Sequence, residues 1–258
     1  MLRKFSNSRT LLQNLQLGGI TAFAAGMTNV ASLIAFFAFT SNITGHYAIL
    51  AEEIAKGHWH QVGVVFIWIF LFFAGSFFSN FLVINSAKLS NYLSHAIPIT
   101  LEFACLITVG IYGHYFYKET LSETEFLVAF LLFAMGLQNG LVASISNGAV
   151  KTTHLTGLTT DLGISISMFT KEKFRKRREL RGKIKLLLTI AFFFLFGGVI
   201  SGLLFLQIGF LTFFFIAAVI AFVLLYDLFN LTRIRYKKLK RDKLRDIQLA
   251  SLSNHDLS

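Results

Sequence analysis

Residues 186–231 read LLLTIAFFFLFGGVISGLLFLQIGFLTFFFIAAVIAFVLLYDLFNL, an apolar stretch of 46 residues in which Asp227 is the only charged residue. As one straight helix this stretch would be about 69 Å long, more than twice the roughly 30 Å of a bilayer core. Gln207 and Gly209 interrupt the stretch near its middle. The stretch therefore predicts a hairpin of two membrane spans, residues 184–206 and 208–231.

The composition of the whole chain agrees with a membrane protein. Of 258 residues, 55% are hydrophobic and 14% are charged, and the chain contains thirty Phe and a single Pro. A soluble domain carries about 25% charged residues, so the composition excludes a water-soluble enzyme and a disordered chain. Four further apolar runs are long enough to cross a bilayer. They are residues 16–40, 61–85, 96–117 and 126–149.

The basic residues predict how these six spans are oriented. Of 24 Lys and Arg, nine lie in the segment 171–185 and eight lie in 233–245, and the net charge is +11. Such clusters mark cytoplasmic segments and do not describe a nucleic-acid-binding surface. We expect a membrane domain over 1–232, a basic cytoplasmic tail over 233–258, and both termini in the cytoplasm.

The basic segment 171–185 is expected to secure this topology and to contact anionic lipid headgroups. Regulation by a cytoplasmic protein partner is the alternative role for this segment. The sequence does not specify an oligomeric state.

An internal repeat divides the membrane domain into two halves, at about 16–117 and 126–231. Three motifs recur in order, with offsets of 110, 112 and 122 residues, and the basic insert 171–185 accounts for the ten extra residues of the last offset. Chance similarity in a sequence rich in Phe, Leu and Gly is the alternative. The matches pair 25–29 with 135–139, 41–46 with 153–158, and Gly75-x-x-x-Ser79 with Gly197-x-x-x-Ser201.

Each half contains three spans, and three is an odd number, so the second half must lie upside down relative to the first. Inverted repeats with interrupted polar segments at matching positions are typical of secondary transporters. We therefore predict an all-α integral membrane protein of six transmembrane helices, built as two inverted three-helix repeats. The paired Gly-x-x-x-Ser motifs are expected to be packing faces within one molecule.

A polar Thr-Gly segment lies at the same place in each half. Thr44-Gly45 precedes a helix-like run over 47–55, and Thr156-Gly157 precedes one over 158–169. Short polar side chains cap helix starts, where the helix carries a partial positive charge. Two such starts facing one cavity would bind an anion or a carboxylate. Alternatively, each segment only ends a membrane helix and begins an interfacial or re-entrant one.

Further polar residues are expected within the spans. Asn29, Gln138 and Asn139 fall near mid-span and are predicted either to line a solute path or to form hydrogen bonds between the two repeat-related helices. Glu102 lies within the third span, and Asp161 follows the second Thr-Gly segment. An intramembrane carboxyl group is costly, so these two are candidates for proton or ion coupling.

The sequence offers little for catalysis, metals or cofactors. Cys105 is the only cysteine, and His58-x-His60 is a weak metal signal that an interfacial belt explains better. No Ser-His-Asp arrangement, phosphate-binding loop or zinc-protease motif occurs in the chain. We therefore expect no catalytic residue, metal or cofactor.

The motifs resemble those of a known family. The block 136–163, with Met-Gly-Leu-Gln-Asn upstream of Thr-His-Leu-Thr-Gly, is the most specific part, and the resemblance extends over about 15–230. It is similar to the YoaK-type family of bacterial multi-pass inner-membrane proteins, a domain of unknown function. The family pattern often has Asp at position 29 and Asn at position 46, whereas this chain has Asn29 and His46. Both departures speak against a carboxylate at position 29 that couples transport to protons in this chain.

The resemblance implies a bacterial cytoplasmic membrane and a polytopic helical fold, but no substrate or reaction. From the residues we predict a secondary transporter or channel-like carrier of a small polar or anionic solute. One alternative is a non-catalytic scaffold or assembly partner. A less favoured alternative is a membrane enzyme on a lipid-linked or acyl substrate, which would use His154 and Asp161 within hydrogen-bond reach.

Overall fold

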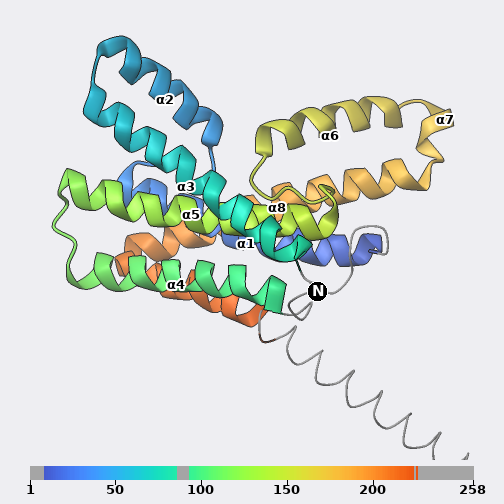
Figure 1. The fold of residues 1–258 in the computed structure, drawn as a ribbon. Helices are drawn as coiled ribbons and strands as arrows, with labels where there is room; N and C mark the ends of the chain where they lie inside the picture. The colour runs from blue at the N-terminus through green and yellow to red at the C-terminus, as the bar shows by residue number, and fades with distance from the viewer. Residues whose placement is uncertain (1–8, 86–92, 224, 226–258) are drawn as a thin grey trace, which may run out of the picture. The chain divides into compact units, whose positions relative to one another are not determined.

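The computed structural model describes residues 9–85, 93–223 and 225, and the regular structure of these residues is entirely helical. The chain divides into two compact units, Met1–Ala221 and Phe222–Ser258, and the fold described below is that of the first unit (Figure 1). Its elements are α1 (Leu11–Phe36), α2 (Ile43–Lys56), α3 (Trp59–Ile84), α4 (Leu93–Tyr115), α5 (Leu121–Ser146), α6 (Leu155–Phe169), α7 (Glu172–Arg175), α8 (Arg178–Ile208) and the 3₁₀ turn η2 (Gly209–Leu211), followed by helical residues 212–221.

Five stretches are long and apolar enough to cross a membrane. Each contains an 18-residue apolar window with at most two charged residues, which agrees with the expected helical membrane protein. They are Leu11–Phe36, Trp59–Ile84, Leu93–Tyr115, Leu121–Ser146 and Arg178–Val223. The first four correspond to the first four predicted spans.

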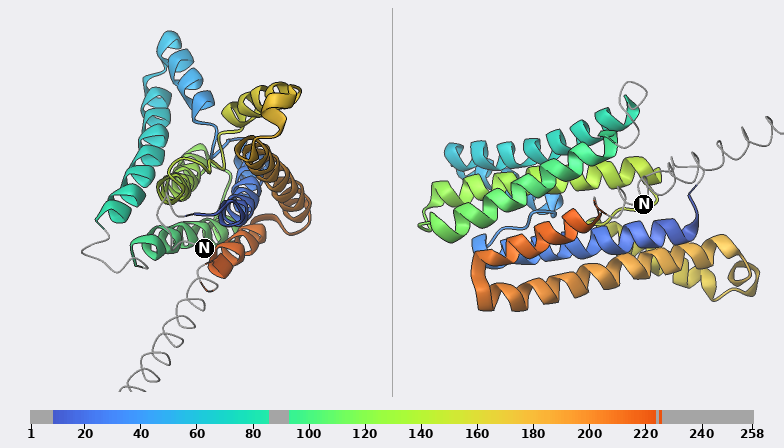
Figure 2. Two further views of the ribbon diagram at one scale, coloured as in Figure 1. Left: turned by 90° about the vertical axis from the view of Figure 1, so that its right-hand side faces the viewer. Right: turned by 90° about the horizontal axis from the view of Figure 1, so that it is seen from below.

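The fifth stretch is a hairpin, as the sequence predicts. α8 ends at Ile208, and Gly209 takes φ +55° and ψ −133°, a backbone conformation that glycine adopts without steric cost. Figure 2 shows the chain reversing its direction at this turn. The Phe210 ring stacks on the Phe213 ring just beyond it. The rest of the predicted sixth span, up to residue 231, lies mostly outside the described residues.

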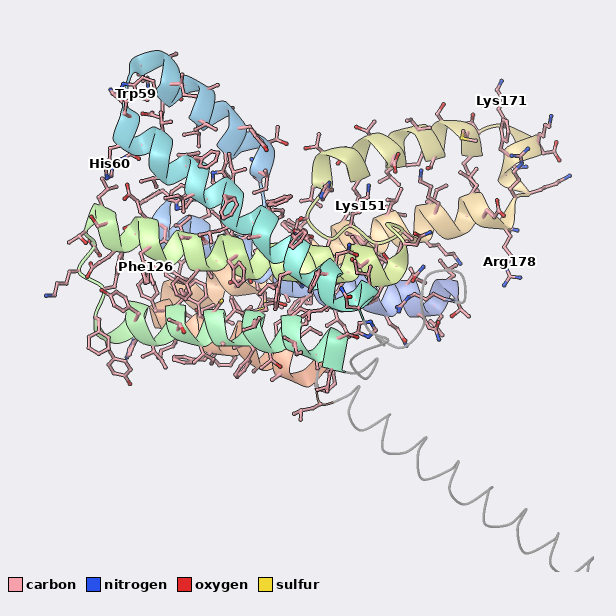
Figure 3. All side chains as sticks on the ribbon, in the orientation of Figure 1. Trp59, His60, Phe126, Lys151, Lys171 and Arg178 are labelled. Carbon is pink, nitrogen blue, oxygen red and sulfur yellow. The ribbon has the colours of Figure 1, made fainter. Side chains whose placement is uncertain are left out.

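The two ends of the long helices differ in chemistry. Figure 3 shows Trp59 and His60 at one end and Lys171 and Arg178 at the other. The basic segment is mostly helical, since it comprises α7 and the first two turns of α8. With 31 residues, α8 is about 46 Å long, so its basic start extends beyond a hydrocarbon core of about 30 Å.

The helices α1 and α5 begin and end in the same way. At the start of α1, the Thr10 hydroxyl accepts a hydrogen bond from the backbone N–H of Gln13, and the side-chain carbonyl of Gln13 accepts one from the backbone N–H of Thr10. Thr120 and Glu123 form the same capping box at the start of α5, 110 residues later. Both helices also end in a left-handed residue with φ +53°, Phe37 or Asn147.

Glycines let two pairs of helices approach closely. α1 packs against α8, where Gly26 faces the backbone carbonyl of Phe194 and Gly197 faces that of Phe23. α3 packs against α5 through Gly136, which faces the Phe72 carbonyl, and Gly75, which faces the Phe133 carbonyl. The two sets of contacts are equivalent, because residues of α1 and α5 correspond at an offset of 110 residues and residues of α3 and α8 correspond at an offset of 122.

Serine hydroxyls complete both contacts. Ser79 donates to the carbonyl of Leu137 at 2.7 Å, and Ser201 donates to that of Met27 at 2.8 Å. Both Gly-x-x-x-Ser motifs are therefore packing faces within the molecule, as predicted. Figure 2 shows that α1 and α8 run in one direction, whereas α3 and α5 run in the opposite direction.

Substitution of Gly26 or Gly136 by Ala should destabilise the protein by about 1–3 kcal/mol, because the added methyl group meets a backbone carbonyl that cannot move alone. Thermal unfolding in detergent would measure this loss. Gly63→Ala is the matched control in α3, since its methyl group meets no heavy atom within 4 Å. Equal melting temperatures for Gly26→Ala and Gly63→Ala would contradict this account of the packing.

Candidate functional site

One asparagine in each half holds the polar segment that follows its helix. The Oδ1 atom of Asn29 accepts hydrogen bonds from the backbone N–H of Thr40 at 3.1 Å and from the Ser41 hydroxyl at 3.0 Å. The Oδ1 atom of Asn139 accepts from the hydroxyls of Thr152 at 3.2 Å and Thr153 at 3.0 Å. Both asparagines therefore bond within their own halves, so the predicted alternative of a hydrogen bond between the two repeat-related helices is wrong for them, although Gln138 forms such a bond.

The amide orientation of Asn29 follows from its partner. A backbone N–H can only donate, so the atom that faces Thr40 must be Oδ1, and Nδ2 points the other way. This Nδ2 donates to no residue that the structure describes. Asn29 is only 8% exposed and lines a cavity. Asn29 therefore brings an amide group with an unused donor to the cavity lining.

This central cavity has a volume of about 530 Å³ and lies between the two polar segments. Figure 1 shows α2 and α6 starting near the middle of the long helices and running outward in opposite directions. The predicted residues Asn29, Thr44, Thr156 and Gly157 all line the cavity. The other lining residues are Phe39, Ser41, Asn42, Ile43, Phe72, Thr153, His154, Leu155 and Phe194.

The two helix starts differ in how they are capped. The Asn42 side chain accepts from the backbone N–H of Gly45 at 3.1 Å and so caps α2. His154 occupies the corresponding position of α6 and makes no such bond. The first N–H groups of α6 therefore have no capping side chain among the described residues and could bind a ligand, with the partial positive charge of the helix start behind them.

Three phenylalanines of the cavity were not predicted from sequence. Phe39, Phe72 and Phe194 look like any other of the thirty Phe. One signal could have found two of them, because Phe72 and Phe194 are separated by the repeat offset of 122 residues. Their backbone carbonyls face Gly136 and Gly26, so the helix contacts hold these rings in place.

The remaining predicted residues lie outside the cavity lining. Gln138 is 3% exposed, and its Nε2 donates to the carbonyl of Thr21 at 2.9 Å, so it joins α5 to α1. Gly45 gives its N–H to the Asn42 cap. Glu102 is 2% exposed on α4, and no described residue forms a hydrogen bond or an ion pair with its carboxyl group.

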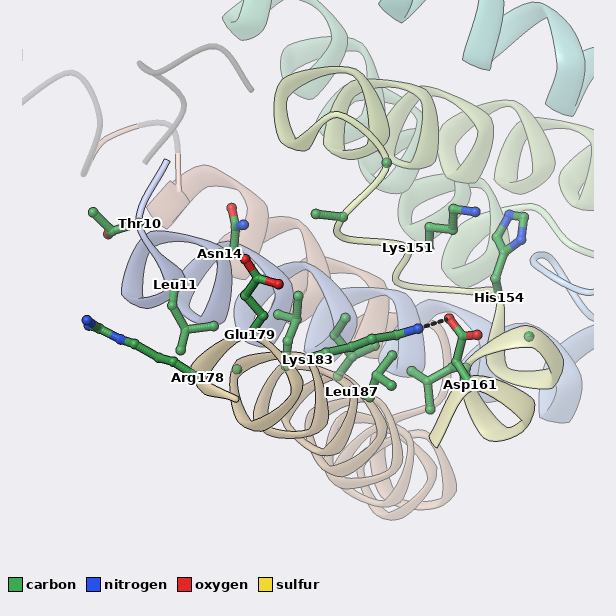
Figure 4. A pocket seen from close by; sticks show the side chains of 17 residues that line it. Thr10, Leu11, Asn14, Lys151, His154, Asp161, Arg178, Glu179, Lys183 and Leu187 are labelled. Carbon is green, nitrogen blue, oxygen red and sulfur yellow. Dashed lines mark ion pairs between the residues drawn. The ribbon is translucent and has the colours of Figure 1, made fainter. Parts of the chain in front are cut away.

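Asp161 lines a second, larger pocket of about 1150 Å³ (Figure 4). Its carboxylate pairs with the Lys183 ammonium at 3.2 Å and forms no hydrogen bond with His154. The contact that a His154–Asp161 enzyme would need is therefore missing. The pocket is lined by Thr10, Leu11, Asn14, Gly148, Ala149, Lys151, His154, Gly157, Leu158, Asp161, Arg178, Glu179, Gly182, Lys183, Leu186, Leu187 and Ile190.

Metal binding finds no support in the described residues. Within them, no three His, Cys, Asp or Glu side chains come close enough to hold one metal ion. His58 instead lies 2.8 Å from the carboxylate of Glu53 at the molecular surface.

His46 lies in the first turn of α2 and packs between Phe39 and Trp68. Its Nε2 lies 2.7 Å from the Phe39 carbonyl and donates to it, and its ring lies edge-on to the Trp68 ring with 5.5 Å between the centroids. Its Nδ1 is buried without a partner among the described residues. Burial lowers the pKa of His46, and the hydrogen bond to Phe39 opposes this effect only in part. Burial therefore favours the neutral form of His46.

The folded protein should lose stability as the pH falls through the pKa of an unfolded histidine, about 6.5, because the unfolded chain then binds a proton that folded His46 does not accept. Melting temperatures at several values between about pH 8 and pH 5 would measure this loss. His46→Gln keeps a donor for Phe39 and should show a weaker pH dependence. Part of the slope should remain, since burial and Lys151 also lower the pKa of His154. Parallel curves for parent and variant would contradict the prediction.

Comparison with known proteins identifies the family. Residues 17–226 match the profile of a family described as protein of unknown function (DUF1275). The match includes both asparagines, both Thr-Gly segments and both Gly-x-x-x-Ser motifs, and it confirms the predicted resemblance. Neither a curated protein nor a solved structure gives a match. The chain therefore belongs to the YoaK-type family of multi-pass proteins of unknown function, DUF1275.

Proposed function

We propose that this protein is a secondary transporter or channel-like carrier of a small polar or anionic solute. The observation that carries the proposal is the central cavity, which two helix starts from different halves of the chain line together. Transporters commonly bind their substrates between such interrupted helices, near the middle of the membrane.

The architecture that we propose is six spans in two inverted repeats. The capping boxes, the glycine contacts, the serine hydrogen bonds and the asparagine anchors all recur at the repeat offsets. The two helix pairs run in opposite directions, as inversion requires. The hairpin at Gly209 supports a sixth span over 208–231.

The location that we propose is a bacterial cytoplasmic membrane, with both termini in the cytoplasm. This orientation follows from the basic segments 171–185 and 233–245. The same segments would contact anionic lipid headgroups.

The donors that face the central cavity favour a solute rich in acceptor atoms. Asn29 offers Nδ2, α6 offers its free backbone N–H groups, and the hydroxyls of Thr44 and Thr156 form no hydrogen bond with any described residue. No carboxylate belongs to the cavity lining, so an anion would meet no repulsion there. The rings of Phe39, Phe72 and Phe194 would exclude water from the bound solute.

Glu102 and Asp161 are the proposed coupling groups, and they would act from outside the central cavity. Glu102 is a buried carboxyl group without a partner among the described residues, and such a group is costly unless it has a function. Asp161 holds Lys183 and would release it if protonated.

The two alternatives receive less support. A scaffold has no need for a cavity with unused donors in its interior, and the enzyme hypothesis lacks the His154–Asp161 contact.

A thermal-shift screen of the detergent-purified protein tests the site directly. The panel contains carboxylates, inorganic anions, amino acids, nucleobases and sugars. A solute at about 100 times its dissociation constant should stabilise the protein by about 2.7 kcal/mol. We expect such a shift for the parent and its loss in a Thr44→Val/Thr156→Val variant. A solute that stabilises both proteins equally would exclude the two threonines from the site.

Asn29→Asp separates the two roles of Asn29. The carboxylate can still accept from Thr40 and Ser41, so the fold should keep its melting temperature to within a few degrees. It has no donor, so it should remove the shift caused by any anion from the panel. Asn29→Ala should lower both the melting temperature and the shift. If Asn29→Asp bound the anion as tightly as the parent, Nδ2 would not be a ligand.

A further inference from the structure

The larger pocket and the central cavity are neighbours, because His154 and Gly157 line both of them. We propose that the larger pocket is the vestibule through which a small anion reaches the central cavity, passing at Gly157 and attracted by Lys151. This inference rests on the proposed transport function, to which it adds the route and the charge preference.

The passage is the first turn of α6. Gly157 lies in this turn, and a methyl group built on it would meet no heavy atom within 4 Å. The space beside Gly157 is therefore unfilled, and any larger side chain at this position would project into it. Among the described residues, only His154 and Gly157 line both cavities.

The charges along the larger pocket favour an anion at the end that adjoins the passage. Figure 4 shows Lys151 beside His154, and Lys183 directed toward Asp161. Lys151 is exposed and forms no ion pair with a described residue, whereas Lys183 is held by Asp161 at 3.2 Å. Glu179 and Arg178 lie at the far end of the pocket. A free ammonium group next to a narrow passage raises the local concentration of anions.

The corresponding positions in the other half carry two aromatic rings that pack together. The repeat offsets place His46 where the vestibule has Leu158, and Trp68 where it has Ile190. These two rings contact each other, and the Trp68 indole donates to the carbonyl of Glu125 at 3.0 Å. Two packed rings therefore stand in the first half where Leu158 and Ile190 line the vestibule in the second half. With the vestibule as proposed, the site opens toward the side of the basic segment 171–185.

Thiol labelling in membrane vesicles tests the route without knowledge of the solute. Cys105 is the only cysteine, so Cys105→Ala gives a background free of thiols. In this background, Ser41→Cys places a thiol of nearly the same size in the central cavity, away from the larger pocket. A small membrane-impermeant reagent, sulfonatoethyl methanethiosulfonate, is added from either side of the membrane.

We expect labelling from the side that carries the basic segment 171–185, and its loss when Gly157→Trp is added. Gly163→Trp is the matched control, because Gly163 lies on the same helix, also has open space around it and lines neither cavity. A smaller change, Gly157→Leu, should slow labelling to an intermediate rate. This graded series remains informative if the Trp variant fails to fold.

The charge preference is tested with a cationic reagent of similar size, trimethylammonioethyl methanethiosulfonate. The anionic reagent should react faster than the cationic one, and Lys151→Ser should reduce this ratio by about ten-fold. Lys171→Ser removes an equal charge outside the pocket and should leave the ratio unchanged.

Labelling from the opposite side, or labelling that Gly157→Trp leaves unchanged, would overturn the route. An unchanged ratio in Lys151→Ser would overturn the role of Lys151. The thermal-shift screen is independent of these results. Solute binding without labelling through Gly157 would reject only the vestibule, whereas labelling without any bound solute would reject the transport function.

Discussion

The close approach of helix backbones at four glycines is the constraint on which this fold depends. Gly26 and Gly197 bring α1 against α8, and Gly75 and Gly136 bring α3 against α5. A side chain at any of these positions would push a backbone carbonyl away. Because lipid tails are as apolar as the helices, such packing and the serine hydrogen bonds beside it must supply much of the association energy.

The same contacts place the candidate site. The carbonyls that face Gly26 and Gly136 belong to Phe194 and Phe72, whose side chains line the central cavity. Asn29 and Asn139 follow the glycines by three residues on α1 and α5, where each anchors the polar segment that starts a short helix. Each half therefore repeats the packing and the anchoring, and the two halves together form the one cavity.

Function would arise where the two halves differ. Asn42 caps α2, whereas His154 leaves the N–H groups of α6 free, so a ligand would bind closer to the second half. His46 and Trp68 pack against each other at the positions where Leu158 and Ile190 line the larger pocket in the second half. A carrier needs such a structural difference between its halves, because its site must open to one side of the membrane at a time.

The sequence by itself determined the helical membrane class, the hairpin near Gly209 and the equivalent motifs, because hydropathy, span length and repeat spacing are local properties of the chain. It also pointed to Asn29, Thr44, Thr156 and Gly157. Only the tertiary structure decided that these four share one cavity with Phe72 and Phe194, that Gln138 instead joins two helices, and that Asp161 pairs with Lys183. These outcomes depend on which faces of distant helices meet, and residue spacing along one chain does not carry that information.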